Sequence, residues 1–321
     1  MQTAMEQCRN DALFTSAKNR YLATRMEELL HQTVDTLTRQ VRKGRFLPAD
    51  YELGFGVAGS LDVAEFALSE EEKMRLRGRI DRVDVMDTGT DTYVKIIDYK
   101  SGQTKFSLLS MYYGLQLQLV VYLNAAMELM KQRPHTGGIL PAGIFYYHVD
   151  EPVIETEGAV DEEQIWQGVF EKLRLDGIVN EDPQMIEAMD ETFTDKSDVI
   201  PVSRTKSGEL SKTSKAYSTE QFAKISAYVN HVIEELGRRM LAGEIDVNAY
   251  ELKGSTACTW CNHRSICGFD THMSGCGYRK LRQIKSDEDI FAAMDREMED
   301  ASEEDMSETV RENESERKEV R

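Results

Sequence analysis

The hydrophobic positions of this 321-residue chain follow helical spacing in some stretches and strand-like spacing in others. Apolar residues recur every three or four positions from Asn19 to Lys43, which predicts a helix, and Gly44 follows where a helix C-cap belongs. Strands grouped between helices predict an α/β sandwich, with a mixed central sheet flanked by helices. Further helices are expected at Asp161–Leu173 and Ser218–Leu241, and strands at Tyr51–Val57, Leu61–Ala67, Arg75–Met86, Thr92–Tyr99 and Pro141–Val149.

Two of these strands are expected to form a hairpin, because the polar turn Asp87–Asp91 joins them. If Met86 pairs with Tyr93, the same register sets Asp81 directly opposite Asp98, with Cβ atoms roughly 5 Å apart. Carboxylates this close repel each other unless a hard cation such as Mg²⁺ or Mn²⁺ lies between them. The hairpin therefore predicts a candidate metal site.

Side chains alternate between the two faces of a strand, so Asp98 and Lys100 are expected on one face and Tyr99 on the other. Two carboxylates and a lysine are the minimum set for metal-dependent phosphodiester hydrolysis. The other acidic residues of the hairpin, Asp84 and Asp87, are expected to be ordinary solvated side chains.

A long apolar helix is expected over Phe106–Lys131, crossing between the Asp98 strand and the strand of Ile144 as part of a βαβ unit. It is apolar nearly all round, which predicts burial against the sheet. Gln118 and Tyr122 are spaced i, i+4 on one face of this helix. Buried polar side chains need partners, so this pair indicates either a site or a core glutamine bonded to backbone.

Three motifs in this order resemble the RecB-type branch of the PD-(D/E)XK nucleases: Gly78-x-Ile80-Asp81, Asp98-Tyr-Lys100-Ser-Gly and Gln118-x-x-x-Tyr122. The resemblance implies a restriction-endonuclease-like sandwich and a DNA exonuclease that depends on Mg²⁺ or Mn²⁺. It further implies that Asp81, Asp98 and the backbone carbonyl of Tyr99 bind the metal, that Lys100 orients the attacking water, and that Gln118 and Tyr122 position Lys100 or the phosphate.

A cysteine motif follows near the other end of the chain, with Cys258, Cys261 and Cys267 at Cys-x2-Cys-x5-Cys spacing. Three thiolates within ten residues can hold zinc, with His263, His272 or Cys276 as a fourth ligand, or part of an iron–sulfur cluster. Spacing alone leaves both alternatives open.

The same cysteine motif, ending in Cys-Gly-Phe-Asp270, resembles the nuclease domains of AddB-type helicase–nuclease subunits, over roughly residues 16–270. This resemblance implies a [4Fe–4S] cluster that joins the two ends of the domain, and a heterodimer with an AddA-like helicase–nuclease subunit. The family's upstream cysteine and Gly-x-x-x-His helix are not found here, which predicts an N-terminally truncated piece. Cys8 is a candidate substitute for the missing ligand.

The net charge of −18 is unusual for a protein that binds DNA. Much of it lies in a predicted acidic, partly disordered tail at residues 286–321, whereas residues 1–285 form the expected nuclease domain. A basic loop spans Arg204–Lys215. An acidic domain of this kind is compatible with DNA as a ligand if a partner subunit makes most of the phosphate contacts.

Several classes of protein are disfavoured by the sequence. No run approaches the roughly 18 apolar residues needed to cross a bilayer, and the N-terminus lacks the pattern of a secretory signal, so no membrane is expected. Clustered cysteines at metal-ligand spacing indicate a reducing cytoplasm rather than disulfides. Glycine pairs lack the Lys-Ser/Thr of a phosphate loop. The remaining alternatives to a nuclease are a catalytically idle DNA- or partner-binding scaffold and a zinc-binding interaction module.

Overall fold

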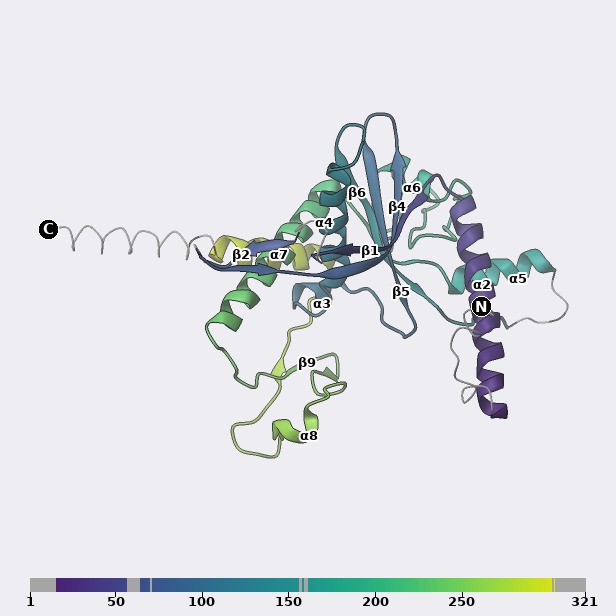
Figure 1. The fold of residues 1–321 in the computed structure, drawn as a ribbon. Coiled ribbons are helices and arrows are strands. Elements are labelled where there is room, and N and C mark those ends of the chain that lie inside the picture. Colours follow the sequence, from purple (N-terminus) through teal and green to yellow (C-terminus); the bar gives the residue numbers. More distant parts are fainter. Residues whose placement is uncertain are drawn as a thin grey trace. The chain divides into compact units, whose positions relative to one another are not determined.

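The computed structural model describes residues 16–56, 64–69, 71–155, 158, 161–301 and 303 (Figure 1). The chain divides into two compact units. Unit 1 comprises Met1–Ala64, Arg77–Phe106 and Tyr122–Ala223, and unit 2 comprises Glu65–Leu76, Ser107–Val121 and Lys224–Arg321. This division does not follow the expected boundary at residue 285.

Unit 1 contains a six-stranded mixed sheet in the order β1-β4-β5-β6-β7-β8, which confirms the predicted fold class (Figure 1). β5 and β6 are parallel, as expected for a βαβ unit, and β7 and β8 are also parallel, whereas the remaining neighbours are antiparallel. The strands are β1 (Leu47–Phe55), β4 (Gly78–Asp87), β5 (Thr92–Lys100), β6 (Ile139–His148), β7 (Asp176–Asn180) and β8 (Ala216–Tyr217).

The helix expected at Asn19–Lys43 is observed as α2 (Ala17–Arg42), with the Ser16 hydroxyl accepting a hydrogen bond from the Asn19 backbone N–H at 3.1 Å. Its C-cap residue is Lys43. The following Gly44 has a different role from the one expected, because a Cβ atom there would lie 2.5 Å from the Ala188 carbonyl oxygen. Gly44 therefore permits close approach of the chain to α6 (Pro183–Met189).

One face of the sheet forms the main core of unit 1, packed against α2, α6 and α5 (Glu162–Lys172). Burial of these side chains supplies the main hydrophobic stabilisation of this face. The fully buried members of this cluster include Phe46, Ile97, Ala142, Phe145, Tyr147, Val179, Met185 and Ile200.

The single helix expected over Phe106–Lys131 is wrong, because two helices occupy this region. α3 (Leu108–Tyr112) ends before Gly114, whose φ of 74° lies in the left-handed region that favours glycine, and α4 (Gln118–Lys131) begins four residues later. The apolar periodicity is continuous across this break, so the spacing of hydrophobic residues did not reveal it.

Unit 2 contains part of α7 (Thr219–Leu241), α3, α8 (Arg264–Cys267), the hairpin β2 (Glu65–Ala67)–β3 (Lys73–Arg75) and a small sheet of β9 (Tyr250–Leu252), β10 (Ser255–Thr256) and β11 (Arg279–Lys280). Residues 287–301 are helical and bury Ile290, Phe291 and Met294. Glu297 on this helix accepts hydrogen bonds from the hydroxyls of Tyr112 and Tyr228. The first part of the expected acidic tail is thus a packed helix, whereas residues 304–321 lie outside the described residues.

Among the described residues, no helix is both long and apolar enough to span a membrane.

Candidate functional site

The β4–β5 hairpin has the register expected from the sequence, with Met86 paired to Tyr93 and Arg82 to Ile97. Its turn is held by Asp87, whose side chain accepts a hydrogen bond from the Gly89 backbone N–H at 2.7 Å. Gly89 itself has a φ of 83°. Local turn chemistry therefore sets which residues of the two strands face each other.

Asp81 and Asp98 come next along the two strands, one step beyond the paired Arg82 and Ile97. Asp81 Oδ2 accepts a hydrogen bond from the Tyr99 backbone N–H at 2.8 Å, which holds this carboxylate beside the end of β5. Lys100 Nζ lies 2.6 Å from Asp98 Oδ2, so these two side chains share a face of β5, as predicted. The hairpin thus brings two carboxylates and a lysine together.

Electrostatics at Asp98 favour a cation. Burial raises the pKa of Asp98, as does the negative charge of Asp81, while Lys100 opposes both effects. Asp98 is only 2% exposed, and no hydrogen bond of regular geometry reaches its Oδ2 atom from the described residues. An incompletely satisfied buried carboxylate beside a second carboxylate fits a divalent metal with oxygen ligands.

The metal site would need oxygen atoms beyond these two side chains. The described residues contain no group of three or more His, Cys, Asp or Glu side chains arranged to hold a metal. Two carboxylates together with a backbone carbonyl, such as that of Tyr99, and water would suit Mg²⁺, which usually retains several water ligands in proteins.

Tyr122 packs at the beginning of β4. Its ring makes an edge-to-face contact with Phe55, with centroids 6.0 Å apart, and both rings crowd Gly78. A Cβ atom at Gly78 would lie 2.7 Å from the Phe55 ring and 3.3 Å from the Tyr122 ring. The glycine of the Gly-x-Ile-Asp motif therefore has a steric role in seating the strand that carries Asp81.

Gln118 is exposed at the first position of α4, so its expected burial is wrong. It belongs to unit 2, whereas Tyr122 belongs to unit 1, as do the residues at the ends of β4 and β5. The role predicted for Gln118 at this site therefore stays a prediction.

The opposite face of the hairpin carries a second charged cluster, formed by Arg82, Asp84 and Lys95. Asp84 is fully buried, so its expected solvation is wrong, whereas Asp87 is exposed as expected. Arg82 donates two hydrogen bonds to Asp84, at 2.6 and 2.7 Å, and Lys95 Nζ lies 2.9 Å from it. The predicted register had already placed Lys95 opposite Asp84, and this signal could have revealed the pair.

A row of polar side chains extends from Asp98 across the neighbouring strands. Asp98 is in register with Tyr146 on β6, which is in turn in register with Asp176 on β7. Lys100 Nζ lies 5.2 Å from the centre of the Tyr146 ring. Burial and the charges of Asp98 and Asp176 raise the pKa of Tyr146 to about 12, so its hydroxyl stays protonated. Sequence reasoning missed Tyr146 and Asp176, because only strand pairing brings them beside Asp98.

The predicted cysteine site lies in unit 2. Cys258 and Cys276 are half-buried and Cys261 and Cys267 are exposed, and the described chain does not gather three of them as metal ligands. Of the other candidate ligands, His263 lies at the N-cap of α8 and His272 Nδ1 lies 2.7 Å from Asp270. Cys8 lies outside the described residues. The cluster assignment thus stays a prediction.

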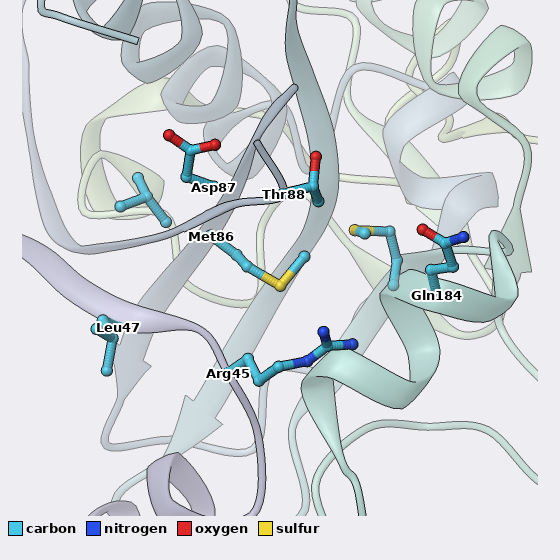
Figure 2. Close-up of a pocket in the computed structure, with 8 residues that line it drawn as sticks. Arg45, Leu47, Met86, Asp87, Thr88 and Gln184 are labelled. Carbon is cyan, nitrogen blue, oxygen red and sulfur yellow. The ribbon is translucent and has the colours of Figure 1, made fainter. Parts of the chain in front are cut away.

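A pocket of about 540 Å³ lies at the other end of β4, beside the hairpin turn, and contains none of the predicted site residues. Figure 2 shows the Met86 side chain pointing toward Arg45 and Gln184. Its lining residues are Arg45, Leu47, Val85, Met86, Asp87, Thr88, Gln184 and Met185.

Comparison with known proteins gives consistent matches. The chain is 38% identical over 297 residues to a subunit of the ATP-dependent helicase/deoxyribonuclease of Lachnoclostridium phytofermentans, covering 90% of this chain and 24% of that protein. It is 37% identical to the proteins of the same name from Alkaliphilus metalliredigens, over 86% of this chain and 24% of that protein, and from Clostridioides difficile, over 88% and 24%. The chain therefore spans about a quarter of the length of these relatives. Residues 1–268 match the family description of the PD-(D/E)XK nuclease superfamily, and the chain belongs to that superfamily.

Proposed function

We propose that this chain is a Mg²⁺-dependent DNA exonuclease domain, a hydrolase of phosphodiester bonds that also accepts Mn²⁺. The observation that carries the proposal is the arrangement of Asp81, Asp98 and Lys100 at the adjoining ends of β4 and β5. Membership of the PD-(D/E)XK nuclease superfamily supports the same reaction class.

Asp81 and Asp98 would hold the metal, with the backbone carbonyl of Tyr99 as a further ligand. When bound, the cation lowers the pKa of water and neutralises negative charge on the phosphoryl group. Lys100 orients the attacking water and stabilises the negative charge that develops in the transition state. Its ammonium group is already held on the same face as Asp98, so little reorganisation is needed.

Gln118 and Tyr122 would position Lys100 or the scissile phosphate. Tyr122 is anchored through its ring contact with Phe55, which leaves its hydroxyl at the end of a fixed side chain. Exposure of Gln118 at the start of α4 is compatible with contact to a substrate.

The relatives are named as subunits of an ATP-dependent helicase/deoxyribonuclease. We therefore place this domain in a larger assembly with an AddA-like helicase–nuclease subunit, acting in the cytoplasm on DNA ends during double-strand-break resection and recombinational repair. A partner that contacts the phosphates would also compensate for the net charge of −18.

The test of the catalytic proposal is a pair of substitutions assayed with Mg²⁺ on linear DNA. Asp98→Ala should abolish cleavage while the domain stays folded, because it deletes one metal ligand and relieves repulsion with Asp81. Lys100→Ala should lower the rate with metal affinity largely kept. Asp35→Ala, at an exposed carboxylate on α2, is the control and should cleave as the wild type does. Wild-type cleavage by Asp98→Ala would refute the site.

We further propose that Cys258, Cys261 and Cys267 hold a [4Fe–4S] cluster, with zinc as the alternative occupant. The spacing and the chemistry of the thiols support this, as does the segment's lack of a core, since Trp260 is 91% exposed and Ile266 is 81% exposed. A bound metal or cluster would stabilise the segment in place of a hydrophobic core.

Two measurements separate these occupants and test the role. Anaerobically purified protein with broad brown absorbance would contain an iron–sulfur cluster, whereas a colourless protein with stoichiometric zinc would contain zinc. Cys261→Ala should make the Thr256–Asp270 segment sensitive to limited proteolysis, as chelation of the wild type should also do. Equal protease resistance in mutant and wild type would refute a stabilising metal site.

A further inference from the structure

The basic loop ending at Lys215 is an ordered tongue, defined here as residues 203–215. The Arg204–Leu210 bridge and the hydrogen bond from the Ser211 N–H to the Ser203 carbonyl, at 2.8 Å, pair its two arms. The tip turns at Gly208, which has a φ of 86°. The tongue therefore presents its side chains from a hydrogen-bonded backbone.

The tongue concentrates positive charge. Its four cations face a single acidic residue, Glu209, which gives a net charge of +3 in a chain of net charge −18. Lys206 and Lys212 are exposed, and neither forms an ion pair with any described residue. Exposed hydroxyl groups lie between them, on Thr205, Ser207 and Thr213. Lysines together with Ser and Thr hydroxyls are typical contacts to phosphate oxygens of nucleic acids.

The base of the tongue is joined to the polar row beside Asp98. Lys215 Nζ lies 3.0 Å from Asp176 Oδ1, and the other oxygen of this carboxylate accepts a hydrogen bond from the Phe106 N–H at 2.6 Å. Asp176 is in register with Tyr146, and Tyr146 with Asp98. The Asp176 contacts thus connect the end of the segment that follows Lys100 to the base of the tongue.

We propose that the tongue is a DNA phosphate-binding subsite, which rests on the proposed nuclease function. A DNA strand with one phosphate at Asp81, Asp98 and Lys100 continues past Tyr146 and Lys215, and its neighbouring phosphates contact Lys206 and Lys212. Binding there is independent of base sequence, because only the backbone is contacted. A local cationic surface also explains how an acidic chain holds a polyanion without relying on its net charge.

The test is the salt dependence of DNA binding, measured by fluorescence anisotropy with a labelled single-stranded oligonucleotide and EDTA. The double variant Lys206→Gln/Lys212→Gln should lower the slope of log K against log salt by about 0.7 per lysine, about 1.4 in total, and weaken binding to all sequences alike. Lys206→Arg/Lys212→Arg should retain the wild-type slope.

The matched control is Lys18→Gln/Lys172→Gln, which removes the same charge from exposed positions on α2 and α5. It should bind with the wild-type slope. An unchanged slope in the tongue variant, or an equal loss in the control, would overturn the proposal. The nuclease proposal is tested separately by cleavage with Asp98→Ala, so failure of one result is distinguishable from failure of the other.

Discussion

Strands β4 and β5 carry charged side chains on both faces, and the two faces treat charge differently. On one face Arg82, Asp84 and Lys95 are at most 6% exposed and are fully paired with one another. On the other, Asp98 is as deeply buried, but its negative charge lies beside the like charge of Asp81. Burial alone therefore does not distinguish a structural charge from a functional one, whereas the balance of partners does.

The physical reason is the cost of desolvation. A buried carboxylate with two cationic partners recovers much of that cost, so its charged form persists. Asp98 has one cationic partner and a neighbouring carboxylate, so its charged form is disfavoured until a further positive charge arrives. The second arrangement is one that a divalent metal completes.

The largest expected effect is on stability when Asp84 loses its charge. Asp84→Asn should lower the free energy of unfolding by about 3–5 kcal/mol, because Arg82 and Lys95 would remain buried without a counter-charge. Urea denaturation in the absence of divalent metal measures it. Asp98→Asn, compared in the same experiment, should not lower stability, since it removes a disfavoured charge. Equal losses in the two variants would contradict the distinction between the faces.

A smaller effect is expected at Gly78, where packing rather than charge seats the strand that bears Asp81. Gly78→Ala should cost about 1–3 kcal/mol, because the added methyl overlaps the Phe55 ring. Thermal unfolding measures the loss. Combining it with Phe55→Leu, which opens the space, should recover part of the stability, and absence of any recovery would show that the strain lies elsewhere.

The smallest expected effect is the pH dependence of the Asp84 contribution. Burial alone would raise the pKa of Asp84, but the charges of Lys95 and Arg82 outweigh it and hold the pKa below its ordinary value of 3.8. The stabilisation is therefore present above pH 3.8 and is lost as the pH falls through the lowered pKa. The difference in unfolding free energy between wild type and Asp84→Asn should narrow in that acid range, measured by denaturation between neutral pH and pH 3. A constant difference would contradict the assignment.

The catalytic arrangement could be read from the sequence because it depends on short-range rules. Turn residues between Asp87 and Asp91 set the register of β4 and β5. Strand alternation then set Asp98 and Lys100 on one face. Helix α2 and the parallel β5–β6 crossover followed from hydrophobic spacing in the same way.

Only the tertiary structure decided the features that depend on residues far apart in the sequence. The break between α3 and α4 follows from the left-handed backbone at Gly114, which apolar periodicity does not report. The row from Asp98 through Tyr146 to Asp176, and the attachment of Lys215 to it, arise from pairing of strands about 30 to 50 residues apart. Sequence patterns encode which face of an element is apolar, but which elements become neighbours is settled by packing of the whole sheet, and that packing fixes the partners of each buried charge.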